Sequence, residues 1–101
     1  MINIPPFHLE IIKEILRKYV PNCEVRVFGS RIMHTVKNYS DLDITIVGKN
    51  KLPKKNLYSL KEAFEESDLS FRVDVLDWNA ISAEFREVIN KRYEILQKSD
   101  R

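Results

Sequence analysis

Cysteine and glycine are scarce in this sequence, and long hydrophobic runs are absent from it. Its 101 residues include one cysteine and two glycines. A single cysteine, Cys23, excludes an internal disulfide and is typical of a reducing compartment. No apolar stretch approaches the roughly 20 residues of a membrane-spanning helix, and residues 1–6 lack the basic segment of a signal peptide. We therefore expect a cytoplasmic protein without a membrane partner, in which Cys23 is structural.

An excess of charge of one sign is also missing. The formal net charge is +2, which is too small to indicate nucleic-acid binding from bulk electrostatics, and the chain has no basic stripe or aromatic platform for single strands. The hydrophobic share of 44% and the charged share of 32% are ordinary for a globular domain. We expect one domain over residues 1–101 that does not bind nucleic acid directly.

Hydrophobic periodicity predicts alternating helices and strands. Helical spacing follows Pro5-Pro6 as far as Pro21, and it returns after Pro53 and after Ser82, a plausible N-cap. In this last helix Phe85, Val88 and Ile89 are expected to face the core. Residues 25–28, 41–46 and 71–76 read as strands, residues 30–36 as a short helical segment, and residues 93–96 as either a closing strand or a helix end. The predicted fold is therefore an α and β domain around a small sheet of at least three strands.

Gly29-Ser30 stands between a predicted strand and a helical segment. Glycine has no Cβ and lets a ligand approach the backbone closely. The free N–H groups of a following helix start favour phosphate, and Ser30 adds a hydroxyl donor. Ordinary turn chemistry explains the pair equally well when it is taken alone.

Asp41 and Asp43 are two residues apart in a predicted strand, so their side chains point to one face. Two unit charges about 4 Å apart repel by about 4 kcal/mol at an effective dielectric constant near 20. A divalent cation removes this cost, and Mg²⁺ takes one or two carboxylates together with substrate phosphates. A solvated strand edge that carries two acids is the alternative.

Asp74 is a third acid, on the polar face of the third predicted strand. It could complete a metal site or pair with Arg26 or Arg72. Asp77 competes for the same role, but an Asx turn at the strand exit explains Asp77 adequately. We therefore choose Asp74 as the third site residue.

The combined pattern of Gly29-Ser30, Asp41-x-Asp43 and Asp74 resembles the polymerase-beta-type nucleotidyltransferase superfamily, and within it the minimal nucleotidyltransferases. The similarity runs through nearly the whole chain and is greatest in the segments 27–31, 39–44 and 72–78. The resemblance implies an α/β (α+β) fold with a small mixed sheet flanked by helices. It also implies that Gly29 and Ser30 bind the phosphates of a nucleoside triphosphate, with ATP as the expected one. Asp41, Asp43 and Asp74 would be the catalytic residues and would bind two Mg²⁺ ions, or Mn²⁺ in their place.

The same resemblance implies a function and a partner. Such proteins act beside a small helical HEPN-type protein in toxin–antitoxin modules and transfer AMP to a hydroxyl of that partner. Tyr39, Tyr58 and Trp78 are candidate contacts. Ile32 and His34 stand where the family usually has small residues, and they favour an alternative, a non-catalytic nucleotide- or partner-binding module. The acceptor, the nucleotide preference and the oligomeric state, including a homodimer, stay open.

Overall fold

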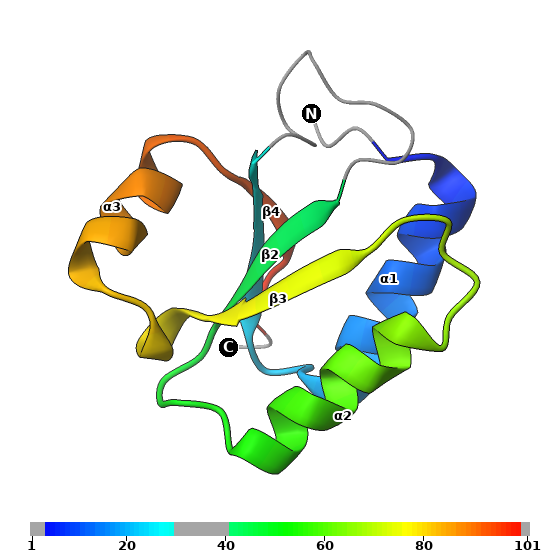
Figure 1. Cartoon of the computed structure of the whole chain (residues 1–101), viewed down its shortest axis with the longest axis horizontal. Coiled ribbons are helices and arrows are strands. Elements are labelled where there is room, and N and C mark those ends of the chain that lie inside the picture. Colours follow the sequence, from blue (N-terminus) through cyan, green and yellow to red (C-terminus); the bar gives the residue numbers. More distant parts are fainter. Residues whose placement is uncertain (1–3, 30–40, 100–101) are drawn as a thin grey trace.

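The computed structural model describes residues 4–29 and 41–99, and it forms a four-stranded sheet with helices on both faces (Figure 1). None of the helices in these two segments is long and apolar enough to cross a lipid bilayer. The predicted helical segment at residues 30–36 lies outside the described residues.

The sheet is mixed, with the strand order β3-β2-β1-β4. Its strands are β1 (Glu24–Phe28), β2 (Leu42–Val47), β3 (Val73–Asp77) and β4 (Glu94–Gln97). Strand β1 pairs antiparallel with β2 and with β4, whereas β2 and β3 are parallel. The small mixed sheet is confirmed, and the open choice for residues 93–96 is settled in favour of a strand.

Helices α1 (Pro6–Tyr19) and α2 (Lys54–Glu65) lie together against one face of the sheet (Figure 1). Both begin directly after a proline with the extended backbone that precedes a helix, near φ −58° and ψ 145° at Pro5. Their apolar stripes close the core over the strands, which explains why the strand side chains on this face are fully buried. The core side chains with no exposed surface are Ile12, Leu16, Val25, Val27, Leu42, Ile44, Ile46 and Leu60.

Helix α3 (Ala83–Lys91) lies on the opposite face and follows the short 3-10 helix η2 (Trp78–Ala80) (Figure 1). The predicted N-cap is confirmed, because the Ser82 hydroxyl accepts a hydrogen bond from the Phe85 N–H at 3.1 Å. Ile89 is buried as expected, but the prediction that Val88 faces the core is wrong, since 56% of its surface is exposed. The apolar stripe of α3 is narrow, and Val88 lies at its solvent side.

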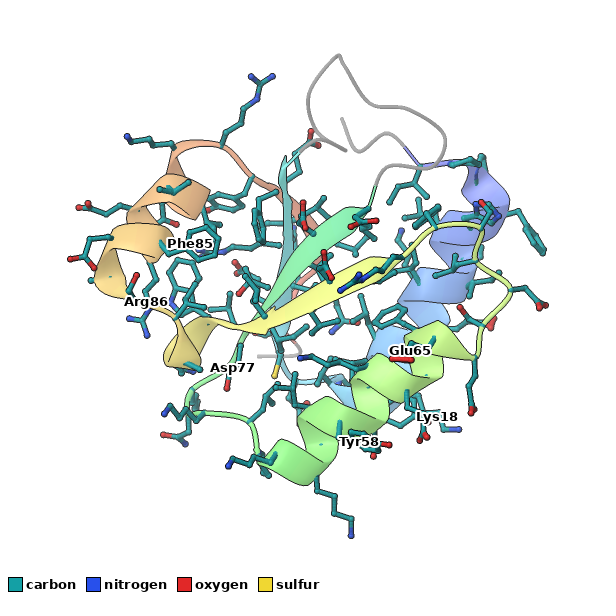
Figure 2. All side chains as sticks on the ribbon, viewed as in Figure 1. Lys18, Tyr58, Glu65, Asp77, Phe85 and Arg86 are labelled. Atoms are coloured by element: carbon teal, nitrogen blue, oxygen red, sulfur yellow. The ribbon has the colours of Figure 1, made fainter. Side chains whose placement is uncertain are left out.

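Helix α3 and the residues that flank it contact the sheet through aromatic and cationic side chains. Phe85 points from α3 toward the sheet (Figure 2) and meets Phe28 edge to face, with ring centroids 5.9 Å apart. The Arg26 guanidinium of β1 lies 4.9 Å from the Trp78 ring centroid and 4.5 Å from that of Tyr93. This face of the sheet is polar, as alternation in β2 predicts, but Thr45 on it is fully buried. Thr45 is flanked across the sheet by Arg26, which is itself stacked between two rings.

Candidate active site

Two of the predicted acids meet at one end of the polar sheet face. Asp43 on β2 and Asp74 on β3 are register partners in the parallel pair. Side chains alternate along strands, and neighbouring strands lie about 4.8 Å apart, so the two carboxyl groups stand side by side on the same face. Phe28 of β1 is the register partner of Asp43 on its other side. The sheet therefore brings together residues that are 31 positions apart in the sequence.

Gly29 directly follows β1 and packs against Asp43, one member of this acidic pair. Its φ of +82° lies in the region that side chains rarely adopt. A Cβ at this position would also stand 2.3 Å from the Asp43 Oδ2 atom, well inside van der Waals contact. Backbone conformation and space both require glycine, because the Asp43 carboxylate lies where a side chain would begin. The predicted approach of nucleotide phosphates to Gly29 stays a prediction.

Burial and repulsion both disfavour the ionised form of Asp43. Burial is the largest cause that raises the pKa of Asp43 above its ordinary value, and the negative charges of Asp74 and then Asp41 add to it. Asp41 is exposed and immediately precedes β2. The other two predicted acids thus both act on the Asp43 carboxyl group, and a positive charge among the three would relieve the repulsion.

Arg72 supplies one such charge at the rim. Its Nε atom lies 3.2 Å from Oδ1 of Asp74, and the two side chains are 75% and 38% exposed. Of the two partners left open for Asp74, the structure therefore selects Arg72. Arg26 instead pairs with Glu24 and donates to the Asn90 side chain at 3.0 Å.

Asp77 has a structural role away from this pair. Its side chain is 5% exposed and accepts hydrogen bonds from the N–H groups of Asn79 at 3.1 Å and Leu52 at 2.8 Å. It is the register partner of Ile46, on the helix-covered face of the sheet. The Asx turn predicted at this strand exit is confirmed, and it separates Asp77 from Asp74.

The donor set fits a divalent cation. Two adjacent carboxylates supply the hard oxygen ligands that Mg²⁺ prefers, with substrate phosphates and water completing its shell. A cation between Asp43 and Asp74 would also remove the repulsion that raises the pKa of Asp43. Within residues 4–29 and 41–99, no three His, Cys, Asp or Glu side chains are arranged around a single ion position. Asp41 as a third ligand therefore stays a prediction.

A cleft of about 880 Å³ opens beside the acidic pair. It extends from the polar face of the sheet, across the outer edge of β3, to helix α2. Its lining residues are Phe28, Asp43, Lys61, Phe64, Glu65, Leu69, Phe71, Arg72, Val73, Asp74, Val75, Leu76 and Phe85. Sequence reasoning missed Lys61, Glu65 and Phe28 as site residues, although Phe28 directly precedes Gly29.

The remaining residues predicted at the site cannot be placed. Ser30, Ile32, His34 and Tyr39 all lie outside the described residues. Their expected contributions to phosphate binding, to crowding of the nucleotide or to partner contact stay predictions. The structure establishes how Gly29, Asp43 and Asp74 are arranged at the N-terminal end of β2.

This arrangement and the order of its elements match a known family. The family model for polymerase beta nucleotidyltransferases matches residues 10–101. The chain belongs to this family. As a polymerase-beta-type nucleotidyltransferase it is an enzyme, and the predicted family resemblance is confirmed over nearly the full chain.

Individual relatives of this nucleotidyltransferase agree with the family match. The probable protein adenylyltransferase MntA of Haemophilus influenzae is 44% identical over 100 residues, which covers 99% of this chain and 88% of that protein. A crystal structure of a toxin–antitoxin with AMP-PNP superposes with a TM-score of 0.75 at 22% identity, over 91% of this chain and 74% of the other. The structure of a tri-AMPylated Shewanella oneidensis HEPN toxin in complex with MNT antitoxin gives a TM-score of 0.69 at 21% identity, over 92% and 71%. At these identities the structures show a shared fold.

Proposed function

We propose that this nucleotidyltransferase transfers AMP from ATP to a hydroxyl group of a HEPN-type partner protein, as the antitoxin-like component of the pair. The observation that carries the proposal is the pairing of Asp43 with Asp74 beneath Gly29, at the mouth of an open cleft. The relative from Haemophilus influenzae is named a probable protein adenylyltransferase, and a structure with the same fold is an antitoxin in complex with an AMPylated HEPN toxin. Both names support the choice of AMP as the transferred group.

The proposed reaction is a substitution at the α-phosphorus of ATP. The acceptor oxygen bonds to this phosphorus, the bond between it and the oxygen that bridges to the β-phosphate breaks, and pyrophosphate leaves. Asp74, whose side chain is 38% exposed, would help the hydroxyl lose its proton. Gly29 and Ser30 would hold the phosphates. Two Mg²⁺ ions, or Mn²⁺, held by Asp41, Asp43 and Asp74 would supply positive charge near the attacking and leaving oxygens.

The open form of the cleft suits an acceptor that belongs to another protein. Tyr58 on α2 is 68% exposed and lies two turns before Glu65 on the same helix (Figure 2). Glu65 and Lys61, one turn after Tyr58, line the cleft. A protein that enters the cleft would therefore meet Tyr58, and aromatic side chains commonly anchor interfaces. Trp78 is a weaker candidate, because the Arg26 and Arg86 guanidinium groups already stack on its ring.

The test is co-expression with a HEPN-type protein encoded next to this chain, followed by size-exclusion chromatography and mass spectrometry of the partner. We expect co-elution and, with ATP and Mg²⁺, a partner that gains the mass of AMP. Label on the α-phosphate of ATP should enter the partner, and label on the γ-phosphate should not. Asp43→Asn and Asp74→Asn should abolish labelling, whereas Asp68→Asn, an exposed acid outside the cleft lining, should not.

Two results would contradict the proposal in different ways. Co-elution without an adduct would favour the non-catalytic binding module. An absence of association, with transfer to another acceptor, would remove the partner and leave the nucleotidyltransferase activity in place.

A further inference from the structure

Arg72 forms an ion pair with Asp74, one of the proposed metal ligands. Its Nε atom lies 3.2 Å from Oδ1 of Asp74, and its side chain lines the cleft that contains Asp43. We propose that Arg72 occupies the cation position on Asp74 when no metal is bound, and that arrival of the metal moves its guanidinium onto the triphosphate of the nucleotide. This inference rests on the proposed function, because it assumes that Asp74 becomes a metal ligand.

The backbone of Arg72 is anchored, and its side chain is mostly exposed. Its carbonyl oxygen accepts a hydrogen bond of 2.8 Å from the Leu42 N–H, which ties this residue to the start of β2 beside Asp43. Its side chain is 75% exposed, and ion pairs at such exposure are weak and screened. A divalent ion competes well against a pair of this kind, so exchange at Asp74 needs no change in the fold.

The released guanidinium would stay beside the reacting groups. A side chain that leaves Asp74 is still fixed at the rim of the cleft by its backbone, next to the place where phosphates must lie to reach the metal. Guanidinium carries five N–H donors in a planar fork, which suits phosphate oxygens. Metal binding would therefore move the Arg72 guanidinium away from Asp74, and nucleotide binding would hold it on the triphosphate.

Lys61 provides a matched control for this exchange. It lines the same cleft from α2 and carries the same charge, but it forms no ion pair with Asp43 or Asp74 in the described part of the chain. A general loss of positive charge in the cleft would affect Arg72 and Lys61 variants alike. If Arg72 competes with the metal for Asp74, only the Arg72 variant should gain metal affinity.

The experiment measures two affinities for the wild type, Arg72→Gln and Lys61→Gln. Binding of Mn²⁺ alone is followed by the loss of the electron paramagnetic resonance signal of free Mn²⁺. Binding of an ATP analogue with a methylene bridge between the α- and β-phosphates is followed by calorimetry at saturating Mn²⁺. We expect Arg72→Gln to bind Mn²⁺ about two- to fivefold more tightly and the nucleotide about tenfold more weakly. Lys61→Gln should not show this pair of opposite changes.

The outcomes separate this inference from the proposed function. If Arg72→Gln leaves Mn²⁺ affinity unchanged, or shifts both affinities in the same direction, the exchange is refuted while the metal site stands. If Lys61→Gln reproduces both changes, the effect is general charge and the exchange is again refuted. If no variant binds Mn²⁺ even with nucleotide, the metal site of the proposed function fails, and the exchange fails with it. Arg72→Lys should recover part of the nucleotide affinity, and circular dichroism melts confirm that each variant is folded.

Discussion

Replacement of Gly29 by alanine tests whether backbone conformation and close packing on Asp43 both require glycine. The backbone at φ +82° costs a residue with a side chain about 1–2 kcal/mol. The added Cβ would lie 2.3 Å from the Asp43 Oδ2 atom, so the carboxylate must rotate away from its preferred rotamer at about 0.5–1.5 kcal/mol. The two terms together predict a loss of about 1.5–3.5 kcal/mol in the free energy of unfolding.

Thermal and urea melts of Gly29→Ala measure this loss. For a domain of this size, 1 kcal/mol corresponds to a shift of about 4–8 °C in Tm, so we expect Tm to fall by about 6–28 °C. Gly48→Ala is the matched control. A Cβ at Gly48 would approach the Cys23 Sγ atom to 3.2 Å, and its backbone is not in the positive-φ region, so its loss should stay below about 1 kcal/mol.

A double-mutant cycle separates the two causes. In an Asp43→Ala background the contact with the carboxylate is gone, and Gly29→Ala should then cost only the conformational part, about 1–2 kcal/mol. The difference between the two backgrounds measures the contact with Asp43. If Gly29→Ala costs no more than Gly48→Ala, or if the cycle is strictly additive, the close approach of Gly29 to the acidic site is not real.

Two further substitutions test the neighbouring acids. The pKa of Asp43 is raised in the folded state by burial and by the charges of Asp74 and Asp41, so its ionised form destabilises the fold at pH values above that pKa, and the penalty fades as the pH falls through it. Asp43→Asn should therefore increase the free energy of unfolding at pH 7 by about 1 kcal/mol after screening of the exposed partners, which raises Tm, and it should have no such effect at pH 3. Millimolar Mg²⁺ should stabilise the wild type but not the variant. Asp77→Ala should cost about 2–4 kcal/mol in urea melts, because two N–H groups lose their acceptor; a loss below 1 kcal/mol would show that Asp77 is not structural.

The local structure of this protein could be predicted well from its sequence. A proline directly precedes both helices on the covered face, a serine caps α3, and alternation over residues 42–46 puts Leu42, Ile44 and Ile46 in the core. These features depend on neighbours within a few positions along the chain, so local patterns carry them. The same holds for the Asx turn at Asp77, whose acceptor and donor are two residues apart.

Long-range register was decided by the tertiary structure alone. The pattern Asp41-x-Asp43 predicts two acids on one face, but only the parallel pairing of β2 with β3 places Asp74 beside Asp43. There its charge adds to burial, the larger cause, in raising the pKa of Asp43. The sequence indicates that Gly29 is a turn residue, whereas its contact with the Asp43 carboxylate depends on the fold.

Burial on the α3 side was likewise a tertiary property. Val88 looks like a core residue by spacing but is exposed, because α3 buries only a narrow stripe. Thr45 has the polar character of an exposed strand face but is fully buried beside Arg26 and its stacked rings. Sequence periodicity determines which residues share a face, whereas the width of each contact depends on what the rest of the chain places opposite that face.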